Sequence, residues 1–156
     1  MFRRTFPLLI IFLLSACVTP YVPPVEGPMA MITLPESKSS YQLIGGMRGT
    51  ASRLAYQDEG KCGKFYKIEE GLNENVAIAV DKKVFFSVTA FHGNTNCEIS
   101  GVFQPQEGGK YRVEFIMGLE KCGMILLEQN PEGKFIPLES GAAKADTFTG
   151  ASVCER

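Results

Sequence analysis

The chain of 156 residues has no tryptophan and a single histidine, His92. With one histidine and no Cys-x-x-Cys pair, it lacks the ligand spacing that zinc sites use. No serine stands in Gly-x-Ser-x-Gly or in the Ser-x-x-Lys motif set, and an activated serine needs a base within hydrogen-bond reach. We therefore expect no enzymatic activity, no metal and no cofactor, and we interpret His92 as a solvated turn residue.

Clusters of basic charge and calcium-loop spacing are also missing. Without Arg3 and Arg4, whose removal is argued below, 14 Lys and Arg stand against 17 Asp and Glu. Nucleic-acid binding needs a clustered basic face, so no nucleic-acid partner is expected. The acidic pairs Asp58-Glu59 and Glu69-Glu70 lack the D-x-D-x-D-G pattern of a calcium loop and are interpreted as solvated loops. Near the glycines of residues 44–49, Arg48 and Arg53 are candidates for contact with an anion or peptidoglycan.

No apolar run reaches the ~20 residues that span a bilayer as a helix. The longest one, "FPLLIIFLL", runs from Phe6 to Leu14 behind Arg3 and Arg4. A positively charged start, a short apolar centre and small residues after it are typical of a secretory signal peptide. We therefore predict a signal peptide over residues 1–16 and export of the chain.

The residues after the apolar run are Leu14, Ser15, Ala16 and Cys17. This sequence resembles the lipobox of bacterial lipoproteins. The resemblance implies that the Cys17 thiol receives a diacylglyceryl group, that cleavage makes Cys17 the first mature residue, and that acyl chains such as palmitate anchor it in the membrane. The next residue is Val18 rather than Asp, which in enteric-type bacteria favours the outer membrane, with the protein facing the periplasm.

Four prolines stand in residues 17–28, "CVTPYVPPVEGP". Proline-rich segments are extended, semi-rigid spacers, so this stretch is predicted to be a tether that lifts the domain off the bilayer. Residues 29–156 are then long enough for one domain.

Alternation of apolar and polar side chains runs through the remainder, as in β-strands. The clearest segments are 75–81, 83–91, 96–103, 110–118 and 122–128, with weaker ones at 30–36, 40–47 and 64–70. Turn-rich clusters separate them at the spacing of a sandwich or barrel. We predict an all-β, antiparallel β-sandwich of about seven to eight strands. Residues 47–60 fit a short helix or a strand equally well.

Four cysteines remain beside Cys17: Cys62, Cys97, Cys122 and Cys154. An even number in an exported chain indicates disulfides, and four cysteines allow three pairings. Segments 96–103 and 110–118 flank a "QPQEGGK" turn, which predicts a hairpin over residues 97–117. Its alternation brings Cys97 and Cys122 to the core near one end of the sheet, so they are predicted to pair. Cys62 and Cys154 then pair by elimination.

The run "CEISGVFQPQEGGKYRVEFIMGLEKC", residues 97–122, resembles small bacterial lipoproteins with immunoglobulin- or transthyretin-like β-sandwich domains. In those proteins a Cys opens a strand, a Phe-x-Pro-x-x-Gly-x-x-Tyr hairpin follows and a second Cys begins the next strand. Here Phe103, Pro105, Gly108 and Tyr111 stand at the four named positions. The resemblance implies the sandwich fold and the Cys97–Cys122 bond, and it brings no catalytic residue with it.

These features predict a membrane-anchored accessory module that binds another protein of the cell envelope. Inhibition of an envelope-attacking enzyme, such as a lysozyme or a protease, is an alternative. Binding of glycan or peptidoglycan is another, although the usual exposed aromatic band is weak without tryptophan. Binding is expected at an exposed sheet edge or at loops away from the tether, with the loop 92–96 and the turn 118–121 as candidate tips.

Overall fold

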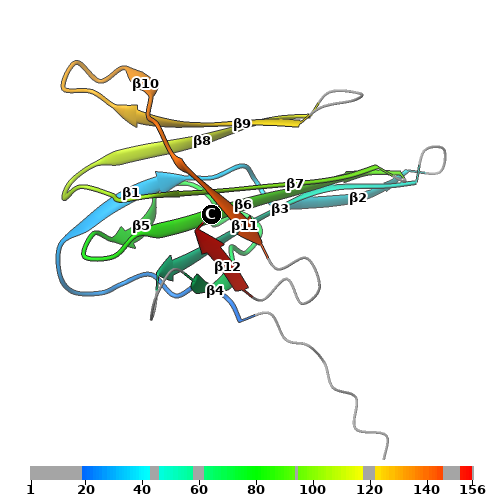
Figure 1. Ribbon diagram of the computed structural model, residues 1–156. Helices are drawn as coiled ribbons and strands as arrows, with labels where there is room; N and C mark the ends of the chain where they lie inside the picture. The colour runs from blue at the N-terminus through cyan, green and yellow to red at the C-terminus, as the bar shows by residue number, and fades with distance from the viewer. Residues whose placement is uncertain are drawn as a thin grey trace, which may run out of the picture.

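The protein is all-β in the computed structural model, which describes residues 19–42, 46–57, 62–93, 95–117, 122–145 and 152–155. Its strands form two sheets in a sandwich-like arrangement (Figure 1). The fold class predicted from the alternating sequence is therefore confirmed. Residues 46–57 form a strand, which decides between the two interpretations of segment 47–60. With five and seven strands in its sheets, the fold has more strands than the seven or eight expected.

The first sheet has five strands in the order β10-β9-β8-β1-β5. Their bounds are β1 (Met29–Thr33), β5 (Val76–Ala79), β8 (Lys110–Met117), β9 (Cys122–Gln129) and β10 (Phe135–Pro137). All neighbours are antiparallel except β1 and β8, which run parallel. The purely antiparallel sandwich was therefore wrong at this pair, because alternation along one strand carries no information about its neighbour's direction.

The second sheet has seven strands in the order β2-β3-β4-β12-β11-β7-β6. They are β2 (Lys38–Gln42), β3 (Gly46–Gln57), β4 (Cys62–Lys67), β6 (Val84–His92), β7 (Thr95–Phe103), β11 (Gly141–Ala145) and β12 (Ser152–Glu155). Strand β3 also pairs with β6. The strands β3, β4, β12, β11, β7 and β6 therefore close into a ring.

Two apolar clusters hold this architecture together. The larger one lies between the sheets and includes Ile32, Leu54, Phe86 and Leu126. The smaller one fills the ring with Ala55, Phe65, Phe85, Val102 and Val153. Strand β6 is buried on both faces from Val84 to Val88, since its odd and even residues serve different clusters. Burial of this apolar surface is the main favourable term in folding.

The hairpin predicted over residues 97–117 was wrong. Strand β7 belongs to the seven-stranded sheet and β8 to the five-stranded one, so the intervening loop crosses between the sheets. Phe103 and Tyr111 do face the same core, with ring centroids 4.8 Å apart, but from opposite sheets. Their alternation identified the buried face of each strand correctly and could not identify the strand's neighbour.

Both disulfides join the cysteines that the sequence pairs. Cys62 and Cys154 lie directly opposite each other on the antiparallel strands β4 and β12. The Cys97–Cys122 bond links β7 to β9, with the Cα atoms 6.5 Å apart. Because β7 and β9 belong to different sheets, this second bond ties the two sheets together instead of bracing a hairpin.

The proline-rich segment 17–28 is not a free tether over the part that the structure describes. Pro20 forms a parallel bridge with Lys67 at the end of β4. The Tyr21 amide donates to the Lys67 carbonyl over 2.9 Å, and the Lys67 amide donates to the Thr19 carbonyl over 3.0 Å. The ordered domain therefore begins by Thr19, ten residues before the predicted boundary at residue 29.

Tyr21 connects this segment to both sheets. Its hydroxyl donates to the Ala77 carbonyl of β5 over 2.7 Å and bonds the Tyr56 hydroxyl of β3. Tyr56 in turn accepts a hydrogen bond from the Ala79 amide over 3.1 Å. Burial, followed by the neighbouring Tyr56, raises the pKa of Tyr21 well above that of an ordinary phenol. A side chain from the expected spacer thus contributes to the packing between the sheets.

Candidate binding surface

The residues singled out in the sequence do not converge on one site. Cys17, the signal segment 1–16 and the turn 118–121 lie outside the described residues. His92 is exposed at the end of β6 and pairs in register with Thr95 of β7. The four disulfide cysteines occupy two separate places.

Arg53 takes part in a polar cluster on the side of the sheet that lines the ring. Its Nη1 atom lies 3.9 Å from Oε1 of Glu98, and its guanidinium carbon lies 6.0 Å from the centroid of the Phe65 ring. The buried Ser87 hydroxyl donates to the same Glu98 oxygen over 3.2 Å. A carboxylate that neutralises Arg53 at this distance weakens the expected contact with an anion.

The outer face of the five-stranded sheet, which points away from the seven-stranded sheet, carries exposed apolar side chains. Ile116 of β8 is 63% exposed, Ile125 of β9 is 44% exposed and Met31 of β1 is 37% exposed. Along each strand, residues next to these side chains belong to the larger apolar cluster between the sheets, so the exposed side chains lie on the opposite face. Exposed apolar side chains gathered on one face commonly mark a surface that another molecule covers.

Strand β8 also has an open edge next to this face. Strand β1 pairs with β8 only at Lys110, Tyr111 and Arg112. From Val113 to Met117, β9 is the only strand that pairs with β8 within the described ranges. Unpaired backbone N–H and C=O groups along an edge are a template for an additional strand.

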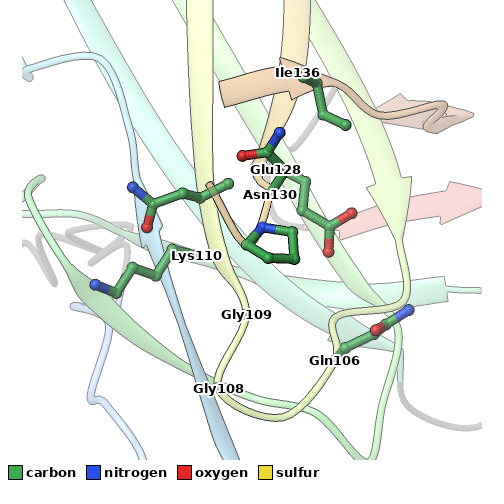
Figure 2. Close-up of a pocket in the computed structure, with 9 residues that line it drawn as sticks. Gln106, Gly108, Gly109, Lys110, Glu128, Asn130 and Ile136 are labelled. Carbon is green, nitrogen blue, oxygen red and sulfur yellow. The ribbon is translucent and has the colours of Figure 1, made fainter. Parts of the chain in front are cut away.

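Two clefts adjoin at the other end of β8. The larger, of about 520 Å³, lies between the loop that crosses the sheets and the β9–β10 turn, and includes Gln106, Lys110, Glu128 and Asn130 (Figure 2). A neighbouring cleft of about 300 Å³ shares Lys110 and Gln129 with it. Lysine and glutamate both line the first cleft, so its charge is mixed.

Tyr111 and Arg112 connect this end of β8 to the crossing loop and to β10. The backbone amide of Gln106 donates a hydrogen bond to the Tyr111 hydroxyl over 2.9 Å, which holds the crossing loop against β8. Burial raises the pKa of Tyr111, and the hydrogen bond from the Gln106 backbone amide partly offsets this increase. On the outer face, the Arg112 guanidinium carbon lies 4.1 Å from the centroid of the Phe135 ring, within the range of a cation–π contact.

The described part of the chain has neither a cluster of metal-ligand side chains nor a membrane-spanning helix. No three His, Cys, Asp or Glu side chains there gather as ligands for a metal ion. No helix in these ranges is long and apolar enough to cross a bilayer. The exposed apolar side chains and the unpaired edge of β8 are suited to contact with an extended chain or an apolar surface.

Comparison with known proteins adds no family. No protein-family model, no curated protein and no solved structure matches the chain at a significant level.

The outer face was missed by sequence reasoning, although a signal for it was present. In segment 110–118, Ile116 alternates in phase with Arg112 and Glu114, which places it on the polar side of its strand. An isoleucine in phase with charged residues is a candidate for an exposed contact residue. Ile125 could not be recognised in the same way, because its position opposite Glu114 follows only from the register of β8 with β9.

Proposed function

We propose that this protein is a lipid-anchored lipoprotein of the cell envelope that binds a partner protein through β8 and β9. The observation that carries the proposal is the pair Ile116 and Ile125, exposed beside the open edge of β8. Apolar side chains supply the favourable burial, and a free strand edge supplies directional backbone hydrogen bonds. The proposal concerns a protein partner because an unpaired strand edge suits a polypeptide.

The position of this surface agrees with an anchor at Cys17. Thr19, two residues after Cys17, enters the domain beside β4. Strands β8, β9 and β10 lie on the opposite side of the molecule from the start of the described chain (Figure 1). A protein held to the membrane at Cys17 would therefore present β8 and β9 away from the bilayer.

The anchor is tested by Cys17→Ser, which removes the acylated thiol. We expect this variant to appear in the soluble periplasmic fraction, whereas the wild-type protein sediments with membranes. Sedimentation of the variant with the membranes would contradict the lipid anchor.

The binding surface is tested by placing a photo-crosslinking amino acid at Ile116 in living cells. Leu72 is the matched control, because both side chains are 63% exposed. We expect one dominant envelope protein to be crosslinked from position 116 and not from position 72. Capture of an envelope-attacking hydrolase would favour the inhibitor alternative. Identical products at both positions would contradict a specific surface on β8.

A further inference from the structure

The segment that follows Cys17 is held on the domain from its second residue, Thr19. Thr19 and Tyr21 both make backbone hydrogen bonds to Lys67, and the Tyr21 hydroxyl is bonded to Ala77 and Tyr56. A fully extended chain advances at most ~3.3–3.6 Å per residue. The Cα atom of Thr19 therefore lies within about 7 Å of the Cα atom of Cys17, whatever the conformation between them.

This distance is comparable with the thickness of one headgroup layer. A bilayer of ~40–45 Å contains a hydrocarbon core of ~30 Å, which leaves ~5–8 Å of headgroup region on each side. Acyl chains on Cys17 would lie in the hydrocarbon core, with the thioether at its boundary. The docked residues Thr19 and Pro20 would then lie within the headgroup layer, because no free spacer separates them from Cys17.

The next side chains along the segment are unusually exposed for their type. Val22 is 75% exposed and Val25 is 90% exposed, the two highest values among the large apolar side chains that the structure describes. The segment runs along the side of the molecule opposite β8 to β10 (Figure 1). Apolar side chains in this position gain by leaving water for the boundary of the acyl chains.

We propose that the segment from Thr19 to Val25 is a membrane-contact surface that lies in the headgroup layer of a phospholipid bilayer through Val22 and Val25. The contact fixes the orientation of the domain, with β8, β9 and β10 facing away from the membrane. The inference rests on the lipid anchor of the proposed function. In place of a domain lifted off the bilayer by a semi-rigid spacer, it describes a domain held directly against the bilayer.

The absence of tryptophan makes the test direct, since a single introduced tryptophan reports on its own surroundings. The acylated full-length product is purified with Val22→Trp or Val25→Trp and inserted into vesicles of phosphatidylethanolamine and phosphatidylglycerol. Ile116→Trp, on the opposite sheet, is the control. With brominated acyl chains in the vesicles, we expect tryptophan emission to be largely lost at positions 22 and 25 and retained at position 116.

The outcomes separate this inference from the anchor on which it rests. Mass spectrometry of the amino-terminal peptide and flotation with vesicles first establish whether Cys17 is acylated. An unmodified Cys17 would overturn the lipid anchor and the membrane contact that rests on it. An acylated protein whose emission at positions 22 and 25 is as insensitive to bromine as that at position 116 would overturn the membrane contact alone. Inserting about ten Gly and Ser residues before Thr19 adds a flexible spacer and should restore the tryptophan emission at positions 22 and 25. If bromine still quenched that emission to the same extent, the short connection between Cys17 and Thr19 would not be what holds the segment at the membrane.

Discussion

Replacing Tyr21 by Phe removes one hydroxyl from the contact between the amino-terminal segment and both sheets. The Tyr21 hydroxyl donates a hydrogen bond to the Ala77 carbonyl. In its hydrogen bond with Tyr56, the Tyr21 oxygen is therefore the acceptor and the Tyr56 hydroxyl is the donor. Without the Tyr21 hydroxyl, a carbonyl of β5 and a hydroxyl of β3 both lose a partner in a partly buried place. The ring remains and still contacts Tyr66, with centroids 6.4 Å apart.

The expected cost follows from these two unpaired groups. Leaving a buried donor or acceptor without its hydrogen bond costs about 1–3 kcal/mol, and water can partly replace the partners of a half-buried group. We therefore expect Tyr21→Phe to lower the free energy of unfolding by about 1–2 kcal/mol. At a loss of about 2–4 °C per kcal/mol, this corresponds to a decrease in Tm of a few degrees.

Urea unfolding of the soluble Cys17→Ser chain, followed by far-ultraviolet circular dichroism, measures this difference. Tyr66→Phe is the matched control, because the Tyr66 hydroxyl has no hydrogen bond within the described residues and should change stability little. If Tyr21→Phe and Tyr66→Phe had equal small effects, Tyr21 would not bridge the sheets as described.

Alkaline pH gives a second signature of the same contact. The pKa of Tyr21 is raised in the folded protein, whereas in the unfolded chain it is about 10. The unfolded state therefore loses this proton first, and stability falls as the pH rises above about 10. We expect this decline to be shallower in Tyr21→Phe than in the protein that keeps Tyr21, and equal slopes would argue against the buried phenol.

Two further predictions concern packing and covalent links. Gly101→Ala should destabilise the protein by about 1–3 kcal/mol through overpacking, because a Cβ atom there would lie 2.6 Å from Cζ of the buried Phe86. Gly123→Ala is the control, because a Cβ atom at that position would have no atom within 4 Å. Equal melting temperatures for the two variants would contradict the close contact. Removing Cys97–Cys122, which closes 25 residues, should cost about 3.5 kcal/mol, and removing Cys62–Cys154, which closes 92, about 4.6 kcal/mol. Alanine pairs measured by urea unfolding test that order, and its reversal would refute the loop-length argument.

The fold class was predictable because alternation is a local property. Val113 and Phe115 of β8 face the core with the expected period, and the same holds for Leu126 of β9. The same local rule failed for the connection between β7 and β8. A turn sequence such as "QPQEGGK" specifies that the chain reverses, but the sheet that each strand joins depends on contacts with strands far away in the sequence.

The candidate surface was predictable only in part. The expectation that the sheet has an exposed strand edge agrees with the unpaired edge of β8 from Val113 to Met117, although the sequence could not identify the strand. Ile116 and Ile125 become a surface only because β8 and β9 pair in one particular register. The docking of Tyr21 was not predictable, because proline-rich composition indicates an extended backbone without indicating whether that backbone packs on the domain.

The amino-acid sequence by itself determined the β-strand content, the number of cysteines available for disulfides, and the lipobox-like start that motivates the anchor. These are properties of neighbouring residues, set by side-chain alternation and short motifs. Only the tertiary structure decided that six strands close into a ring, that Cys97–Cys122 joins two sheets, and that the chain is held on the domain from Thr19. Each of these depends on which distant strands pair, and that choice is made by burial of the whole core and not by any one segment.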